Sequence, residues 1–138
     1  MIKPTSLRAA LVAAIPSLAT DPERLTVFID AGHVAATGTR TPSFEYRYTA
    51  HAMVLDFAGE ADHVFIAIVE WARANQPDLV TNADQRESGI TFEADILNNQ
   101  TVDLSIKLQL TESVVVSTDA SGKRTIRHVD DSGDHWLG

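Results

Sequence analysis

Residues 44–57 carry the longest alternating pattern in the chain, and this pattern constrains the fold most. Apolar side chains occupy every second position from Phe44 to Val54, and polar side chains fill most of the gaps. This period of two is typical of a β-strand with one apolar and one polar face. From Met53 to Phe57 the apolar side chains move to odd positions, which predicts a bulge, a strong twist or burial on both faces. At ~3.3 Å per residue the strand would reach roughly 46 Å. We therefore expect it to be central in a sheet, or to project and pair with another chain.

A hairpin is predicted farther along the chain. Residues Ile90–Leu97 alternate apolar and polar side chains, and Val102–Leu110 alternates in the same way. Asn98 and the residue after it supply the turn, because asparagine tolerates positive φ. The pattern stays extended to Ser117, and Arg124–Val129 is predicted as the last strand.

The earlier segments are interpreted from composition and turn residues. We expect a first strand over Leu25–Ala31 and a short second strand over Val34–Thr39, with Gly32 marking a hairpin turn between them. Residues 79–89 are polar and irregular, so they are expected to form a mobile loop.

Two amphipathic segments predict helices. Residues 4–18 repeat apolar side chains every three or four positions, and Pro16 should kink or end this helix. Residues 61–75 carry a second apolar stripe, which ends before Pro77. Helices do not alternate one-for-one with strands, so the sequence predicts an α+β fold: a mostly antiparallel sheet with two helices packed on one face.

Length and composition limit the classes of protein and of function. We expect one domain over residues 1–129 and an acidic tail over residues 130–138. The net charge is −8, and no basic stripe for sequence-independent DNA binding is present. A protein that lets DNA pass without binding it would have this charge, and so would many acidic cytoplasmic enzymes. The absence of cysteine excludes disulfides and thiolate metal sites, and no segment approaches the ~20 apolar residues of a membrane span.

The sequence contains no catalytic motif. The histidines form no HExxH pair, and the glycines form no phosphate-binding loop. His128 and His135 flank several aspartates, which we interpret as a solvated tail rather than a metal site. Glu93, Asp95 and Asp103 fall on the polar face of the predicted hairpin, without the burial or charged neighbour that acid–base catalysis needs. We therefore predict no catalytic residue, no metal and no cofactor.

Several segments in collinear order carry a family resemblance. They are KPTSLR (3–8), FIDAG (28–32), SFEYRYT (43–49), DFAG (56–59), W-x4-QPD (71–78), GITFEADILN (89–98) and DLSIKLQLTE (103–112). Over residues 1–113 the chain thereby resembles the phage tail completion protein R family of temperate contractile-tailed phages. The resemblance fades after Glu112.

This resemblance implies a structural virion protein, similar in role to a tail terminator, and not an enzyme. Such a subunit binds the last ring of the tail tube at the head-proximal end, stops polymerisation and presents a surface to the head completion or neck proteins. The implied partners are copies of itself in a hexameric ring, the tail tube protein, the tail sheath and the neck proteins. Genome DNA would pass through the ring without specific binding, no membrane is involved, and assembly would occur in the host bacterial cytoplasm.

Residue roles in such a ring are expectations from the strand pattern. The polar strand faces carry two basic and several acidic side chains: Glu45, Glu93, Asp95, Asp103 and Glu112 against Arg47 and Lys107. If this face lines the lumen, Glu93, Asp95 and Asp103 would repel DNA phosphates. Contacts with neighbouring subunits or neck proteins are expected at Arg47, Trp136 and Leu137, and truncation before residue 130 would test the last two.

Two other classes of protein stay open. One is a soluble α+β enzyme or ligand-binding domain whose site is too distributed to see, and a deep apolar pocket with a perturbed acid or histidine would favour it. The other is a head-side neck adaptor, which would have similar partners one ring farther from the tail. A ring of the size of the tail tube, without such a pocket, would favour the terminator.

Overall fold

The computed structural model describes residues 1–98 and 100–130. Its helices are α1 (Lys3–Ala14), α2 (Pro16–Thr20), the 3-10 helix η1 (Pro22–Arg24), α3 (Ala61–Asn75), α4 (Asp78–Thr81) and α5 (Ala83–Ser88). Its strands are β1 (Leu25–Ala36), β2 (Phe44–Phe57), β3 (Ile90–Ile96), β4 (Val102–Thr118) and β5 (Arg124–His128).

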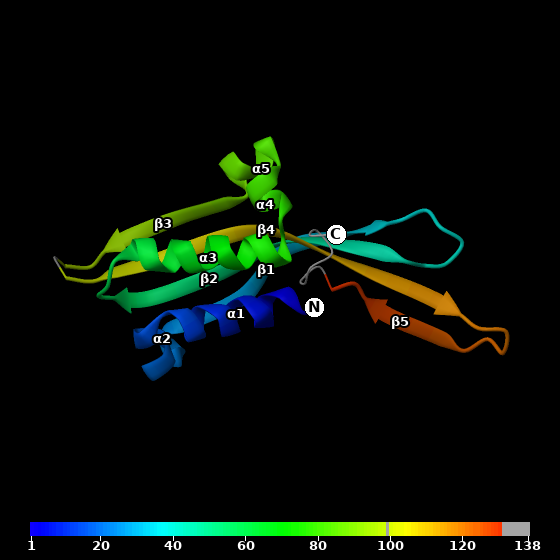
Figure 1. The fold of residues 1–138 in the computed structure, drawn as a ribbon, viewed down its shortest axis with the longest axis horizontal. Helices are drawn as coiled ribbons and strands as arrows, with labels where there is room; N and C mark the ends of the chain where they lie inside the picture. Colours follow the sequence, from blue (N-terminus) through cyan, green and yellow to red (C-terminus); the bar gives the residue numbers. More distant parts are fainter. Residues whose placement is uncertain (99, 131–138) are drawn as a thin grey trace.

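The strands form one antiparallel sheet in the order β1-β2-β4-β3, and β5 pairs with the end of β4. The two long helices, α1 and α3, lie side by side on one face of this sheet (Figure 1). Trp71 Nε1 on α3 donates a hydrogen bond of 3.0 Å to Ser6 Oγ on α1, which joins the two helices. The predicted α+β class, with a mostly antiparallel sheet and two helices on one face, is confirmed.

The long strand predicted from alternation is β2, and it lies between β1 and β4. Its even-numbered side chains from Tyr48 to Val54 are buried in the core with the facing side chains of β4. The register of β2 against β4 shifts between Val54 and Phe57, and Asp56 within this interval has a φ of 55°. This bulge brings the odd-numbered Phe57 back to the buried face, whereas Leu55 at the preceding odd position is exposed.

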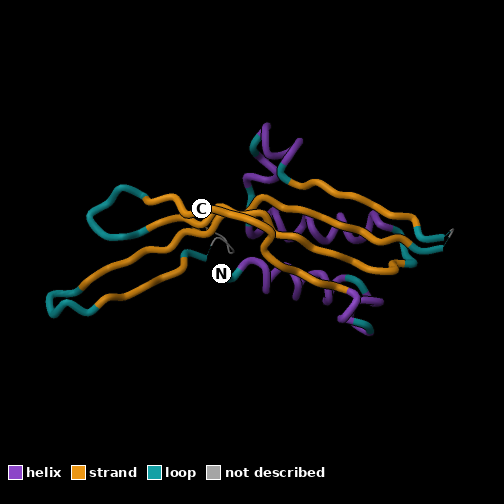
Figure 2. Tube along the Cα trace, turned by 180° about the vertical axis from the view of Figure 1, so that it is seen from behind, coloured by secondary structure: helices purple, strands orange, loops and turns teal. Residues whose placement is uncertain are grey.

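Two hairpins extend beyond the helical layer. We call residues 31–48 the β1–β2 arm and residues 113–129 the β4–β5 arm. Both project from the same end of the molecule, away from α3 (Figures 1 and 2). Every residue of β5 is exposed, and β1 is exposed from Phe28 to Val34. The β1–β2 arm stays joined to β4 through the pairing of Phe44 with Val114, whereas the β4–β5 arm beyond Val114 has two strands only. A two-stranded ribbon alone is marginally stable, so the β4–β5 arm is a surface on which another chain could pack.

The predicted hairpin turn at Gly32 is wrong. β1 runs unbroken through Gly32 to Ala36, so Val34–Thr39 is not a separate strand. Gly32 instead pairs with Tyr48 across the ladder, where an added Cβ would lie 2.6 Å from the Tyr48 Cβ. The glycine permits close approach of two strands, and the turn comes later.

The segment 79–89 was expected to be an irregular loop, and this is also wrong, because most of it forms α4 and α5. Asn82 Oδ1 accepts hydrogen bonds from the backbone N–H groups of Asp84 and Gln85, which caps the first turn of α5. The break at Pro16 is confirmed: α1 ends at Ala14, and the proline begins α2.

Glu112 was predicted on the polar strand face, but its side chain is only 1% exposed. Its carboxylate accepts hydrogen bonds from the backbone N–H groups of Ile2 (2.7 Å) and Lys3 (3.4 Å) and from the hydroxyl of Tyr48. Burial, and then the hydrogen bond to Glu112, raises the pKa of Tyr48 well above its usual value. Lys3 Nζ, also buried, donates a 2.6 Å hydrogen bond to Gln76 Oε1. A buried polar network thus links the start of α1 to β4. The carboxylate accepts hydrogen bonds from backbone N–H groups that have no partner within the helix at its N-terminus.

Candidate functional site

The sheet face opposite α1 and α3 is not covered by any described element, and we call it the open face (Figure 2). Strand alternation places the odd-numbered side chains of β2, β3 and β4 on it. Polar pairs cross the strands there: His51 Nε2 contacts Ser105 Oγ, and Thr49 Oγ1 donates to Gln109 Oε1 at 3.2 Å. Hydroxyl, amide and imidazole groups that pair laterally in this way form a surface that water can wet.

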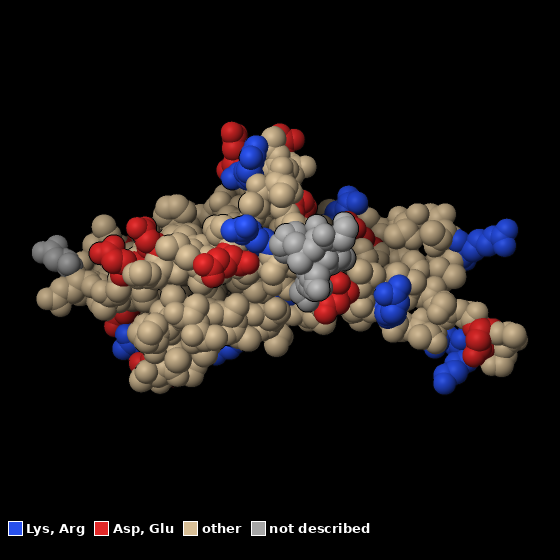
Figure 3. Space-filling view, in the orientation of Figure 1, with Lys and Arg blue, Asp and Glu red and all other residues tan. Residues whose placement is uncertain are grey.

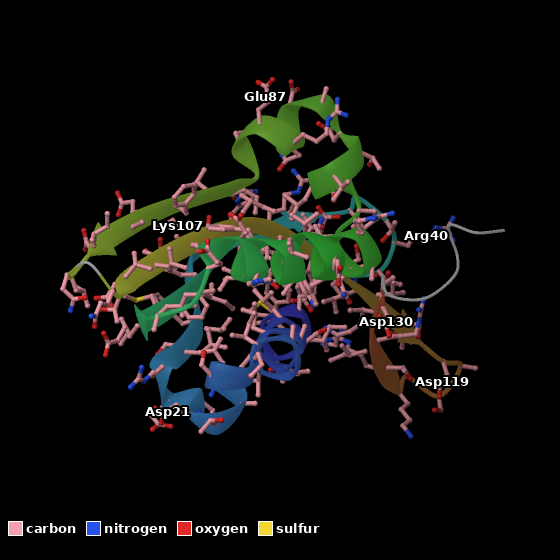
Figure 4. All side chains as sticks on the ribbon, turned by 60° about the vertical axis from the view of Figure 1, so that its left-hand side comes forward. Asp21, Arg40, Glu87, Lys107, Asp119 and Asp130 are labelled. Carbon is pink, nitrogen blue, oxygen red and sulfur yellow. The ribbon has the colours of Figure 1, made fainter. Side chains whose placement is uncertain are left out.

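Four charged side chains of the open face neutralise one another. Lys107 Nζ lies 3.4 Å from Asp30 Oδ2, and Arg47 Nε lies 2.7 Å from Glu45 Oε1. Figure 4 labels Lys107 on the sheet. Arg47, predicted as an inter-subunit contact, therefore already pairs within its own strand, although its side chain remains exposed.

The predicted acidic residues form a strip on the β3–β4 hairpin. Asp95 lies directly opposite Asp103 in the ladder, and Glu93 lies opposite Ser105. Among the described residues, no basic side chain forms an ion pair with any of these three acids. Asp103 Oδ1 accepts a 2.7 Å hydrogen bond from the backbone N–H of Asp56. Like charges directly opposite each other lower the stability of a sheet. The strip therefore adds negative charge to the open face and lowers the stability of the β3–β4 hairpin.

The structure brings these three acids together, but it does not test their role in a ring. Trp136 and Leu137 lie outside the described residues. Sequence reasoning missed an apolar surface on the helical side, where Ile66 and Val69 of α3 and Phe92 of β3 are exposed. The signal was Ile66, which lies off the buried stripe of its helix.

A cleft of about 720 Å³ opens between α2 and the start of α3. Its walls are mainly apolar, and its titratable side chains from α3 and the residue before it, Glu60, His63 and Glu70, are exposed. The described part of the chain holds no group of three His, Cys, Asp or Glu residues that could bind a metal ion. None of the helices in that part is long and apolar enough to cross a membrane.

Comparison with known proteins decides the family. The profile of P2 phage tail completion protein R (GpR) matches residues 1–132, which continues past Glu112, where the quoted motifs end. The chain belongs to this family. It is 40% identical over 131 residues to Tail completion protein R of Escherichia phage P2, a match that covers 95% of this chain and 84% of that protein. No solved structure matches the chain.

Membership confirms the resemblance inferred from the sequence. The chain is a structural protein of the phage tail, a component of the virion that acts with other tail components.

Proposed function

We propose that this GpR family member is a tail terminator subunit. Copies of it form a hexameric ring that binds the last ring of the tail tube at the head-proximal end, next to the tail sheath. The ring stops tube polymerisation and presents a surface to the neck proteins, and genome DNA passes through it without specific binding. The subunit has no catalytic or cofactor-binding role in this proposal.

The observation that carries the proposal is a bare polar sheet face between two unpaired edges. β1 ends one side of the sheet, β3 and β5 end the other, and no described strand pairs with their outer edges. Free edges are a hazard for aggregation, and a closed ring of sheets removes them. In such a ring the helices would lie outside and the open face would line the channel.

The charges of the open face support this orientation. The ion pairs Lys107–Asp30 and Arg47–Glu45 cancel, so the negative charge that remains is that of Glu93, Asp95 and Asp103. Repeated around a ring, this strip repels phosphates and keeps DNA from adhering to the wall.

The first experiment measures the mass of the purified chain in solution, alone and then with its tail tube protein. We expect a discrete hexamer, or a monomer that becomes a ring only on tube ends and halts their growth. A monomer that does not bind tube ends would contradict the proposal. It would favour the alternative of an enzyme or ligand-binding domain, with the cleft beside α2 as its candidate site. A ring that binds neck proteins but not tubes would instead indicate a head-side adaptor.

Reversing the acidic strip tests its place in the channel. We expect the triple variant Glu93→Lys, Asp95→Lys, Asp103→Lys to slow DNA ejection from phage particles that carry it, because lysines would bind passing phosphates. Its matched control is Glu23→Lys, Asp84→Lys, Glu87→Lys, which reverses exposed charges away from the open face. If the triple variant ejects DNA at the same rate as the control, the acidic strip does not line the channel. Trp136 and Leu137 stay the predicted anchors for a neighbouring subunit or neck protein.

A further inference from the structure

A second exposed surface lies on the outer side of α3. A shallow groove there, which we call the α3 groove, is lined by Asp62, Phe65, Ile66, Val69, Glu70 and Arg73. Ile66 is 52% and Val69 is 41% exposed, although a surface helix ordinarily presents polar side chains to water. The ring of Phe65 lies 5.1 Å from that of Phe92 on β3, which continues the apolar surface onto the sheet. Two carboxylates, those of Asp62 and Glu70, and one exposed guanidinium, that of Arg73, lie beside this apolar strip. Exposed apolar area with a charged rim is the composition of a contact surface.

The β4–β5 arm exposes the opposite chemistry. Pairing with β4 places Arg124, Ile126 and His128 on one face of β5, and Ile126 is 61% exposed. No acidic side chain among the described residues forms an ion pair with Arg124. The only acid of residues 113–129 is Asp119 at the tip, labelled in Figure 4, whose carboxylate accepts hydrogen bonds within its own turn. In Figure 3 basic side chains gather on the arms, and acidic side chains are more frequent over the helices.

The two surfaces match in spacing as well as in charge. On α3, Asp62, Ile66 and Glu70 follow one another at four-residue intervals, so the two acids are ~12 Å apart along the helix with the isoleucine midway. On β5, Arg124 and His128 are ~13 Å apart, with Ile126 midway. The acid–apolar–acid row on α3 is therefore nearly as long as the basic–apolar–basic row on β5 and complements it in charge, since His128 can donate a hydrogen bond to a carboxylate.

One chain cannot make this contact by itself, because the arm projects from the end of the molecule that lies away from α3 (Figure 1). We propose that the β4–β5 arm of one subunit docks in the α3 groove of the next copy of this chain. Ile126 packs on Ile66 and Val69, and the basic side chains beside it meet the two carboxylates. Different surfaces meet in such a head-to-tail contact, which closes into a ring when the rotation allows. This inference rests on the proposed ring and names the contact that would hold it together.

The natural chain has no cysteine, so one engineered pair reports the contact without background. We expect the double variant Ile66→Cys, Ile126→Cys to give a ladder of disulfide-linked oligomers on oxidation, because docking brings these positions within bonding reach. The matched control, Ile96→Cys with Ile126→Cys, uses an exposed isoleucine outside the groove and should give no ladder. Each assay is run on the chain alone and on tube ends.

Charge reversal supplies the second readout. In the cysteine pair, Asp62→Lys with Glu70→Lys should slow cross-linking by about tenfold, since steering by surface charge sets encounter rates. Adding Arg124→Glu with His128→Glu to that variant should restore the rate.

The outcomes separate this contact from the proposed function. A ring of the correct mass that gives no ladder overturns the arm contact and leaves the terminator standing. Absence of both ring and ladder, alone and on tubes, overturns both. Two results together would overturn the inference. The first is a cross-linking rate that does not change when the charges of Asp62 and Glu70 are reversed, and the second is loss of binding to a DNA duplex in the variant Arg124→Glu. The arm would then be a contact for DNA.

Discussion

Replacing Glu112 with alanine is expected to lower the free energy of unfolding by about 3 to 5 kcal/mol, because it removes the acceptor from a buried polar network. The backbone N–H groups of Ile2 and Lys3 and the hydroxyl of Tyr48 would lose a partner. Water cannot replace it cheaply at a position where the glutamate is 1% exposed. Thermal unfolding should shift by roughly 10 °C or more in a chain of this size.

The control for this change is Glu93→Ala, which removes an exposed carboxylate and should change the stability by less than about 0.5 kcal/mol. A loss below about 1 kcal/mol for Glu112→Ala would show that the network adds little. The raised pKa of Tyr48 gives an independent check. The folded state keeps the phenol proton that the unfolded state releases above about pH 10, so stability should fall with rising pH there. Tyr48→Phe should remove that part of the slope.

The elements with regular periodicity could be predicted from the sequence, since their apolar side chains report which face is buried. The alternation over residues 44–57 predicted β2, and the even-to-odd change left a bulge, a strong twist and burial on both faces open, of which the structure shows the bulge. The phase of β4 puts Glu112 on the buried face with Leu110 and Val114, but its residue type argued for the polar face, because a glutamate is normally exposed. Its burial depends on amides of Ile2 and Lys3, which lie more than one hundred residues earlier in the chain.

The acidic strip was predictable for the same reason as the strand faces, because alternation alone puts Glu93, Asp95 and Asp103 on one side of a hairpin. The ion pair between Lys107 and Asp30 was not, since Asp30 lies at a register irregularity in β1 that no periodicity reveals. The exposure of Ile126 on the arm and of Ile66 on α3 was also not predicted, because periodicity assigns apolar residues to a single core. A surface that is completed only by another copy of the chain does not fit that assumption.

Substituting alanine for Gly32 is expected to destabilise the fold by about 2 to 4 kcal/mol, because the new methyl group would overpack the β1–β2 ladder. Its Cβ would lie 2.6 Å from the Tyr48 Cβ and 2.8 Å from the Arg47 carbonyl oxygen, and neither atom is the end of a flexible side chain. To relieve the clash, β1 must move away from β2 at the base of the β1–β2 arm.

The measurement is urea unfolding of Gly32→Ala beside Ala36→Val, which adds bulk at an exposed position of the same strand and should stay within about 0.5 kcal/mol of the natural chain. Equal stabilities for the two variants would mean that the strands separate at no cost. Because Tyr48 also donates to Glu112, movement of β2 at this point would disturb the buried network. The double variant Gly32→Ala, Glu112→Ala should therefore lose less stability than the sum of the single changes.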